Sequence, residues 1–242
     1  FQKVSVVING VAILKDIDLQ IQSGSTLAIV GRVGSGKTTI GRLIPRMIQA
    51  NRGMVLIDGM AVDQIPLQVL RSAIGYVPQD TFLFSDTLRN NISLGMETAS
   101  EEDIMWAAEV SQLSKDFSDF PTGLDTVIGE RGVTLSGGQK QRTAIARAVI
   151  RRPKILILDD AMASVDTNTE QEIMSQLQDV MAQSTTILIS HRISTVQSAD
   201  QIIAINEGRI VEKGTHTDLV AQGGIYAEMY RYQQLTQELR EF

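Results

Sequence analysis

Cysteine is absent from the 242 residues of the sequence, and aromatic residues make up only 5% of them. Without cysteine, disulfide bonds and thiolate metal sites are excluded, and the chain is compatible with a reducing cytosol. No apolar run approaches the roughly 18 residues of a membrane-spanning helix, and the segment from Phe1 to Ser5 lacks the pattern of a signal peptide. The sequence therefore predicts no membrane span of its own.

An excess of positive charge is also lacking. Lysine and arginine total 22 against 28 for aspartate and glutamate, which gives a net charge of -6. No nucleic-acid partner is therefore expected, because binding to a phosphate backbone needs a basic surface. With 43% hydrophobic residues, the chain is long and apolar enough to bury a core as one large domain or two small lobes.

Short apolar runs alternate with longer segments of helical spacing. Runs that are apolar at successive positions, and so on both faces of a strand, are typical of a buried parallel sheet. Helical spacing is found over 38–48 and 139–151. The alternation predicts the α/β class with a mostly parallel, doubly wound sheet. The predicted strands are Thr26–Val30, Ile74–Val77, Lys154–Leu158 and Thr185–Ile189.

Three further segments complete the predicted architecture. Residues 201–212 read as a tight hairpin, as does the segment around Asp58 and Gly59, so we expect a small antiparallel sheet that flanks the parallel one. The end of the chain, 226–242, is polar and helix-prone and is expected to form a surface helix.

Helix signals dominate from about Thr81 to Arg151, where strand signals fade. We therefore expect a nucleotide-binding core formed by 1–80 and 152–242, including the antiparallel β subdomain, with an inserted helical subdomain over 81–151.

The residues from Gly31 to Thr38 fit the pattern of a phosphate-binding loop between a strand and a helix. Glycines let successive backbone N–H groups point at phosphate oxygens, and the helix adds its positive end. Lys37 is expected to reach the β- and γ-phosphates, and the Thr38 hydroxyl to coordinate Mg²⁺. The predicted nucleotide-binding residues here are Gly31, Arg32, Val33, Gly34, Ser35, Gly36, Lys37, Thr38 and Thr39.

Two carboxylates, Asp159 and Asp160, follow the apolar run Lys154–Leu158. The carboxyl ends of parallel strands meet at the edge of the sheet where nucleotides bind. Asp159 is therefore a candidate to hold Mg²⁺, and Asp160 lies near where an attacking water would sit. Without the phosphate-binding loop, the pair would read as an ordinary exposed strand end.

These features fit any P-loop NTPase, including small GTPases and nucleotide kinases. The segment Leu135-Ser136-Gly137-Gly138-Gln139 is different, because it resembles the signature motif of the ABC ATPases in every residue. The resemblance implies a RecA-like P-loop NTPase core. Ser136 and the glycines also read as the N-cap and first turn of a helix, and that structural interpretation holds alongside the functional one.

The resemblance implies a pair of domains that sandwich two ATP molecules. The signature, Leu135 to Gln139, is then expected to face the γ-phosphate bound by a second ABC ATPase domain. ATP and Mg²⁺ are the implied cofactors. Thr38, Gln79 and Asp159 would hold the metal, and Lys37, Gln79, Asp160 and His191 would form the catalytic set.

The remaining family motifs occur in order along the chain. Gln79 matches the Q-loop glutamine, and Ala163 to Asp166 matches the D-loop, whose Ser164 and Asp166 would touch the opposite domain. His191 matches the switch histidine, which would hydrogen-bond the γ-phosphate and orient the attacking water. A lone histidine after a strand would otherwise read as structural.

The segment 126–132 resembles the X-loop of exporters, which meets the transmembrane domains. Residues 80–87 and 229–235 are similar to bacterial multidrug-type half-transporters of the MdlA kind. The implied location is the cytoplasmic face of the inner membrane. Because the chain begins at Phe1, within an apparent strand, we expect it to be excised from a longer protein with transmembrane segments upstream. Processing or a choice of numbering is the alternative interpretation of this start. The apolar residues 82–84 read either as core of the helical lobe or, as we favour, as part of that interface.

Asp160 departs from the family pattern, in which glutamate stands after the metal-binding aspartate. The shorter side chain predicts slow turnover at this chain's own phosphate-binding loop. Heterodimeric exporters resemble this case, so the partner is expected to be a different half-transporter. The aromatic that usually stacks on adenine aligns near Ile8, which offers an apolar contact without a π-face and leaves the base preference open.

Two rival functions stay open on the sequence. A non-transport ABC protein is disfavoured because no coiled-coil insertion or basic surface is visible. A nucleotide-clamped regulatory module would retain binding and dimerisation with little hydrolysis, which Asp160 permits. A GTPase is disfavoured because no guanine-reading segment of the Asn-Lys-x-Asp type occurs.

Overall fold

The computed structural model describes residues 1–129 and 132–239. It consists of two compact units, one formed by Phe1–Arg71 with Thr185–Phe242 and the other by Ser72–Ser184. The second unit contains the segment 81–151 and extends beyond it at both ends, because strands on either side of that segment pair with each other.

The first unit contains a small antiparallel sheet in the order β2, β1, β4. Its strands are β1 (Gln2–Ile8), β2 (Val11–Ile17) and β4 (Arg52–Met54). Asn9 and Gly10 connect β1 to β2 with φ angles of 51° and 80°. Positive φ at both residues is typical of the tight turn that fits a twisted hairpin. The expected flanking antiparallel sheet is present, although it is built from the N-terminal strands.

A second hairpin surrounds Asp58 and Gly59, as the sequence predicts. It pairs β5 (Leu56–Ile57) with β6 (Met60–Ala61) in antiparallel fashion.

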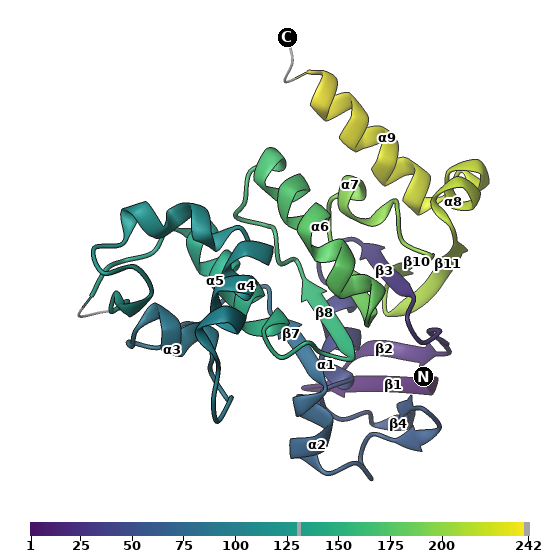
Figure 1. Cartoon of the computed structure of the whole chain (residues 1–242). Helices are drawn as coiled ribbons and strands as arrows, with labels where there is room; N and C mark the ends of the chain where they lie inside the picture. Colours follow the sequence, from purple (N-terminus) through teal and green to yellow (C-terminus); the bar gives the residue numbers. More distant parts are fainter. Residues whose placement is uncertain (130–131, 240–242) are drawn as a thin grey trace. The chain divides into compact units, whose positions relative to one another are not determined.

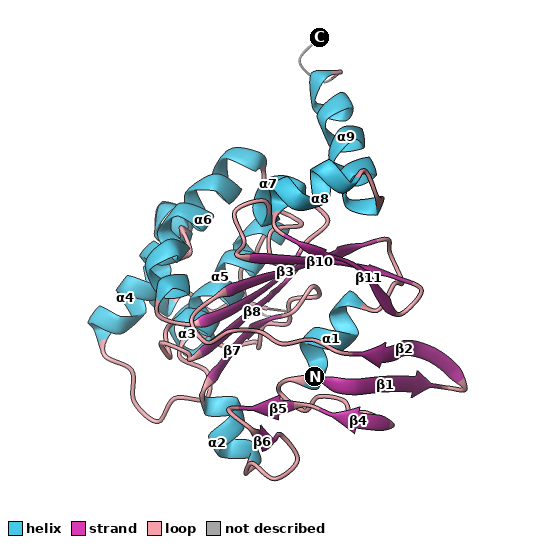
Figure 2. Ribbon diagram, turned by 90° about the vertical axis from the view of Figure 1, so that its right-hand side faces the viewer, coloured by secondary structure: helices cyan, strands magenta, loops and turns pink. Residues whose placement is uncertain are grey.

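The main sheet of the first unit runs β11, β10, β3, β9. Figure 2 shows β11, β10 and β3 side by side. Its strands are β3 (Thr26–Gly31), β9 (Thr185–Ile189), β10 (Gln201–Asn206) and β11 (Arg209–Gly214). β3 is parallel to both neighbours, and β11 is antiparallel to β10. The predicted α/β class with a mostly parallel sheet is confirmed.

The predicted hairpin over 201–212 is confirmed, but its first strand, β10, belongs to the parallel sheet rather than to the flanking one. The physical reason is burial, because Ile202, Ile203, Ala204 and Ile205 are all 0% exposed. A strand that is covered on both faces reads as a continuous apolar run, whereas a half-exposed antiparallel strand alternates.

Helices of the first unit are α1 (Lys37–Leu43), α2 (Leu67–Ser72), α7 (Ile193–Val196), α8 (His216–Gln222) and α9 (Ile225–Glu238). The helix predicted over 38–48 ends early, at Leu43. Pro45 explains this end, because proline has no N–H to continue the helical hydrogen bonds, and Arg46 then leaves the helical region with φ 52°. The predicted C-terminal surface helix is confirmed as α9 as far as Glu238 (Figure 1), and residues 240–242 lie outside the described residues.

The second unit combines two parallel strands with a group of helices. The strands are β7 (Ile74–Val77) and β8 (Ile155–Asp159). The helices are α3 (Leu88–Ile92), α4 (Glu101–Val110), η1 (Leu113–Asp119), η2 (Gly123–Asp125), α5 (Gly137–Val149) and α6 (Thr167–Ala182), where η marks a 3₁₀ helix. On α5, Ile145, Ala148 and Val149 are buried, which is the apolar face that the helical spacing predicts.

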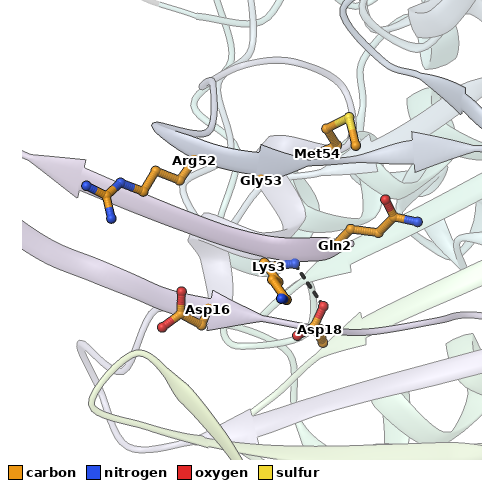
Figure 3. A pocket seen from close by; sticks show the side chains of 7 residues that line it. All are labelled: Gln2, Lys3, Asp16, Asp18, Arg52, Gly53 and Met54. Atoms are coloured by element: carbon orange, nitrogen blue, oxygen red, sulfur yellow. Dashed lines mark hydrogen bonds between the residues drawn. The ribbon is translucent and has the colours of Figure 1, made fainter.

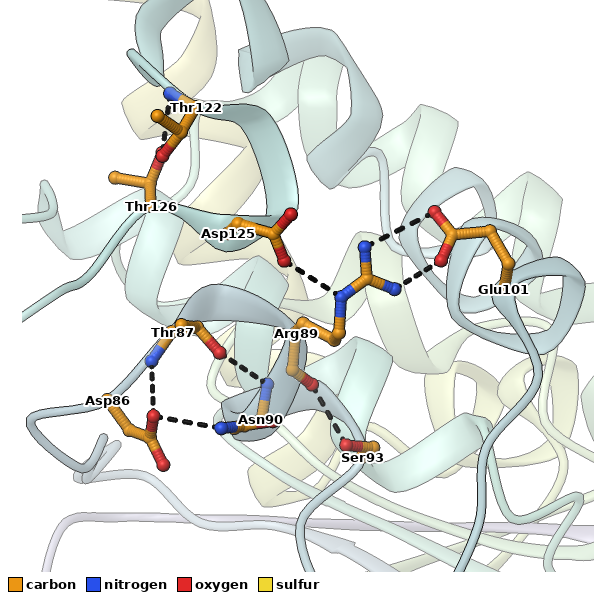
Figure 4. A network of polar contacts seen from close by, with 9 residues as sticks. All are labelled: Asp86, Thr87, Arg89, Asn90, Ser93, Glu101, Thr122, Asp125 and Thr126. Atoms are coloured by element: carbon orange, nitrogen blue, oxygen red, sulfur yellow. Dashed lines mark hydrogen bonds and ion pairs between the residues drawn. The ribbon is translucent and has the colours of Figure 1, made fainter.

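Polar contacts tie the short helices of this unit together (Figure 4). Arg89 of α3 donates to Glu101 of α4, and its Nε lies 3.0 Å from the Asp125 carboxylate of η2. These hydrogen bonds raise the pKa of Arg89 above its ordinary value. Nearby, hydrogen bonds from the Asn90 side chain and a backbone N–H lower the pKa of Asp86. Such exposed ion pairs contribute at most about 1 kcal/mol each.

A more deeply buried ion pair joins α5 to η1. The Arg142 guanidinium donates to both carboxylate oxygens of Asp116 at 2.7 to 2.9 Å. The two side chains are only 13% and 14% exposed. This fork geometry fixes the first half of α5 against the 3₁₀ segment before it.

Candidate functional site

The phosphate-binding loop leaves β3 and enters α1 in the first unit, as the sequence predicts. Gly31, Gly34 and Gly36 take φ angles of 148°, 79° and 106°. At Gly31, a Cβ atom would lie 2.2 Å from the carbonyl oxygen of Ile205 on β10. Only glycine fits there, and the loop can therefore follow the end of the strand closely.

Lys37 is held across this loop by its own backbone. Its Nζ donates to the carbonyl oxygens of Gly31 at 2.9 Å and Arg32 at 3.0 Å, and the residue is only 6% exposed. Because burying an ammonium is costly without partners, the loop is shaped around this side chain. The cation is thereby held inside the loop, against its first two carbonyl groups.

Ser35 supplies a test of whether the loop fits a phosphate. Within the described part of the chain, its Oγ is buried and has no hydrogen-bond partner. A buried hydroxyl without a partner is unfavourable, and a phosphate oxygen would satisfy it. The residues present therefore fit the triphosphate that the loop pattern implies.

Neighbouring elements anchor the loop from below. The N–H of Gly208, in the turn between β10 and β11, donates to the Ser35 carbonyl at 3.2 Å. The Gly208 carbonyl in turn accepts from Lys15 of β2 at 2.8 Å. Arg32 and Val33 at the tip are exposed, whereas Thr38 and Thr39 are half-buried in α1. The loop is thus fixed at its base and open at its tip.

His191 lies at the same edge of the sheet as this loop. β3 and β9 are parallel and pair Ile29 with Ile189, so both strands end at the same level. His191 follows β9 by two residues, is half-buried, and precedes α7. The structure therefore brings the predicted switch histidine and the phosphate-binding loop to one sheet edge.

Ile8, the predicted base contact, ends β1 beside the Asn9–Gly10 turn and pairs with Val11. Ile8 is 43% exposed and Val11 is 61% exposed. The hairpin end thus presents an aliphatic surface, which suits a flat apolar contact without a π-face.

A separate hollow lies against the antiparallel sheet (Figure 3). The Lys3 backbone N–H donates to the Asp18 carboxylate at 2.8 Å beside it. Its lining residues are Gln2, Lys3, Asp16, Asp18, Arg52, Gly53 and Met54. None of the residues predicted to bind nucleotide or metal is among them.

In the second unit, β8 ends in the two predicted carboxylates. Asp159 is 0% exposed, and its carboxylate accepts a hydrogen bond from the Tyr76 hydroxyl at 3.0 Å. Asp160 is 8% exposed and takes a left-handed conformation with φ 46°. Aspartate tolerates this region better than most residues, and here it ends the strand sharply.

Tyr76 was not singled out from the sequence. It lies on β7, which pairs in parallel register with β8 and places Tyr76 opposite Ile157. The sequence did contain one indication of its role, a tyrosine hydroxyl within the otherwise apolar run Ile74–Val77. Only the pairing of β7 with β8 reveals that this hydroxyl orients the Asp159 carboxylate.

The signature residues begin α5, as predicted. The Ser136 Oγ accepts from the Gln139 N–H at 3.2 Å, and the Gln139 side chain accepts from the Ser136 N–H at 3.0 Å. This reciprocal capping box confirms the N-cap interpretation. Ser136 and Gly137 are exposed, whereas Leu135 is buried as an anchor. The tip of the helix is therefore accessible to a partner.

The D-loop packs directly against this helix. The Ser164 N–H donates to the Gln141 side chain at 2.8 Å, and a Cβ atom at Gly137 would lie 3.2 Å from the Ser164 Cβ. Asp166 caps α6 by accepting from the Thr169 N–H, which lowers the pKa of Asp166. The structure thus joins the signature and the D-loop into one exposed surface.

The other sequence motifs of the second unit lie at its surface. Gln79 follows β7 and is exposed. Phe82 is 66% exposed and Phe84 is 48% exposed, and their rings meet edge to face at 5.0 Å. The interpretation of these two rings as lobe core is wrong for that reason. In the segment 126–132, Ile128 is buried, and residues 130–131 lie outside the described residues.

The expected metal ligands are the hydroxyl of Thr38, the side-chain amide of Gln79 and the carboxylate of Asp159. The described residues contain no group of three or more histidine, aspartate or glutamate side chains that could hold a metal ion. A sparse donor set suits Mg²⁺, which commonly takes one or two carboxylates together with substrate phosphates. No helix within the described ranges has the length and apolar character needed to cross a membrane.

Comparison with known proteins gives consistent matches. A family model described as ABC transporter matches residues 14–163. The uncharacterized ABC transporter ATP-binding protein YwjA of Bacillus subtilis is 47% identical over 221 residues, which cover 91% of this chain and 38% of that protein. An ATP-dependent lipid A-core flippase of Chromobacterium violaceum is 46% identical over 220 residues, covering 91% of this chain and 38% of the flippase.

A solved structure of a bacterial Atm1-family ABC exporter with ATP bound is similar in three dimensions. Its TM-score is 0.93 at 41% sequence identity, and the match covers 97% of this chain and 41% of that chain. The chain therefore spans less than half the length of the relatives that it matches.

Proposed function

This chain belongs to the ABC transporter family, and we propose that it is the ATP-binding and hydrolysing domain of an exporter. One observation carries the proposal above the others. The loop after β3 buries both Lys37 and the hydroxyl of Ser35, and that hydroxyl has no partner among the described residues. A triphosphate supplies a negative charge for the Lys37 ammonium and a hydrogen-bond acceptor for the Ser35 hydroxyl.

The residues divide the work of binding and reaction. Lys37 and the loop N–H groups hold the phosphates, and Thr38, Gln79 and Asp159 hold Mg²⁺. When bound, the metal neutralises phosphate charge and fixes the geometry of the phosphates. Tyr76 keeps the Asp159 carboxylate oriented through its hydrogen bond of 3.0 Å.

Two residues act on the attacking water. Asp160 accepts its proton or orients it, and His191 hydrogen-bonds the γ-phosphate and the water. The aliphatic end of the first hairpin, at Ile8, contacts the base.

The signature surface completes the site of a second ABC ATPase domain. The exposed N-terminus of α5, with Ser136 and Gly137, offers donors to an anion on the partner, and the D-loop beside it makes the neighbouring contact. We infer that the partner is a different half-transporter with glutamate at the position of Asp160. ATP then joins the two domains, and its hydrolysis releases them.

Export requires contact with transmembrane domains, which we expect in the rest of a longer protein. The exposed edge-to-face pair of Phe82 and Phe84 is an apolar surface suited to receive a short helix from such a domain. This assignment puts the chain at the cytoplasmic face of the inner membrane.

A fluorescent ATP analogue tests the nucleotide site directly. The chain should bind it in the presence of Mg²⁺, and Lys37→Ala should weaken binding at least tenfold. Lys213→Ala, which removes an exposed lysine of β11, serves as the matched control and should leave binding unchanged. Equal binding by Lys37→Ala and the unaltered chain would contradict the proposal.

Radiolabelled ATP then separates turnover from clamping. Asp160 specifically favours one second candidate, a regulatory module that binds ATP and dimerises with little hydrolysis. Stable ATP-dependent dimers on size-exclusion chromatography without phosphate release would support that module instead of a transport ATPase.

A further inference from the structure

The loop that carries His191 is held by a side chain of the C-terminal helix. The Oε1 of Gln233 on α9 accepts from the Ile193 N–H at 2.8 Å, and its Nε2 donates to the His191 carbonyl oxygen. Only this orientation of the amide gives both of its ends a partner, because the N–H can only donate and the carbonyl can only accept. Gln233 therefore bridges the backbone on both sides of Arg192.

Helix α9 is itself firmly anchored, at the end away from this loop. The Glu212 carboxylate of β11 accepts from the N–H groups of Ile225 at 2.5 Å and Tyr226 at 3.0 Å. These bonds satisfy two of the unpaired donors of a helix start and place a negative charge at its positive end. The buried Tyr226 hydroxyl lies 2.7 Å from Nδ1 of His216 on α8.

The anchored helix then carries Gln233 about two turns further along a rigid axis. α9 runs past α7, the short helix that follows His191 (Figure 1). The position of Gln233 is thus set by β11 and α8, and neither element belongs to the His191 loop, to which Gln233 is hydrogen-bonded.

The two sides of the His191 loop are supported differently. Upstream, the ladder between β3 and β9 reaches Ile189 and holds the strand. Downstream, the Ser190 hydroxyl accepts from the Arg192 N–H at 3.0 Å, which shapes the turn locally. Gln233 supplies a tertiary anchor on this downstream side.

We propose that Gln233 is a positioning residue for His191, fixing the backbone from which the imidazole reaches the γ-phosphate. The inference rests on the proposed function, since it assigns the histidine its role in ATP hydrolysis. A displacement of about 1 Å at a reacting group can cost on the order of a hundredfold in rate. Loss of the bridge slows hydrolysis while leaving every nucleotide-binding group in place.

The test replaces Gln233 by methionine in the chain of residues 1–242. Methionine matches the length and helix propensity of glutamine but forms no comparable hydrogen bond. Gln234→Met, one residue further along α9 and exposed, is the matched control. Three quantities are measured: single-turnover phosphate release, the dissociation constant of a fluorescent ATP analogue, and amide hydrogen exchange at Ile193.

For Gln233→Met, phosphate release should slow by about tenfold to a hundredfold, with nucleotide affinity within about twofold, as expected for an interaction absent from nucleotide binding. Exchange at Ile193 should accelerate by about fivefold, the factor for one lost hydrogen bond. Gln234→Met should change none of the three. Gln233→Glu keeps the acceptor for Ile193 but opposes an oxygen to the His191 carbonyl, so its release rate should fall as well.

Faster exchange at Ile193 with an unchanged release rate would overturn the proposal, because Gln233 would then only dock α9. A loss of nucleotide affinity as large as the loss of rate would overturn it too, since the damage would not be confined to the reaction. If Gln233→Met does not fold, Gln233→Glu decides on the same criteria. If the unaltered chain neither binds the fluorescent ATP analogue nor releases phosphate, the proposed function fails instead, and that failure is recognised before any variant is compared.

Discussion

Lengthening the side chain at position 160 by one methylene, with Asp160→Glu, should speed ATP hydrolysis at this chain's own phosphate-binding loop. The aspartate carboxylate stands on a short arm at the end of β8, where the backbone turns with φ 46°. Glutamate would extend the carboxylate by one methylene, about 1 Å, toward the position proposed for the attacking water. A shift of that size is worth on the order of a hundredfold in rate, or about 2.7 kcal/mol of barrier.

The same change should cost stability, for two structural reasons. Position 160 is 8% exposed, so an added methylene has to be packed at a cost of about 1–3 kcal/mol. The left-handed backbone there also suits aspartate better than glutamate. The melting temperature should therefore fall by about 2–4 °C for each kcal/mol lost.

The assay is release of radiolabelled phosphate at saturating ATP, paired with thermal unfolding. Asp160→Asn keeps the size of the side chain and removes the carboxylate, so its rate should fall below that of the unaltered chain. Asp179→Glu makes the same one-methylene change on the exposed face of α6 and should alter neither quantity. A lower melting temperature without a faster rate for Asp160→Glu would refute the idea that arm length limits turnover.

Three further outcomes are expected. Burial, with a smaller effect of a neighbouring tyrosine, raises the pKa of Tyr226 to about 12. The unfolded side chain titrates near 10, so the free energy of unfolding should fall by up to about 1.4 kcal/mol per pH unit between 10 and 12. In Tyr226→Phe, the free energy of unfolding, measured with urea at several pH values, should fall less steeply with pH over this range. An equally steep fall in the variant would contradict this. Arg142→Met leaves a buried carboxylate unpaired and should cost about 3 kcal/mol in urea unfolding. Arg89→Met removes ion pairs that are exposed to solvent and should cost under about 1 kcal/mol, and equal costs would argue against the role of burial. Gly31→Ala should abolish nucleotide binding, because a Cβ there would lie 2.2 Å from a backbone oxygen of β10. At Gly34 an added Cβ would have no atom within 4 Å, so Gly34→Ala should cost only about 1 kcal/mol of backbone strain. If both variants lose nucleotide binding to a similar extent, the clash at Gly31 is unimportant.

Much of the fold was predictable because the relevant signals are local. The runs that became β3, β7 and β9 are apolar at successive positions, which reports burial on both faces directly. The sheet membership of β10 was misjudged because a hairpin turn says how two strands connect, not which third strand lies beside them. The early end of α1 was not predicted because the helix-ending effect of Pro45 was overlooked.

The candidate site was predictable where residues close in sequence cooperate. The phosphate-binding loop and the capping box of Ser136 and Gln139 each lie within a few residues, so their spacing alone carries the geometry. Tyr76 and Gln233 were missed, because each acts on a residue far along the chain. Nothing in a single sequence indicates such pairs until the strands and helices are placed.

By itself, the amino-acid sequence determined the motifs, their order and the local turns that shape them, since these depend on φ preferences and side-chain spacing over a few residues. Tertiary structure decided which hydroxyl orients the Asp159 carboxylate and which helix forms hydrogen bonds with the loop of His191. The physical reason is that a hydrogen bond needs its two atoms about 3 Å apart, and for residues distant in sequence only the packing of the chain brings them together.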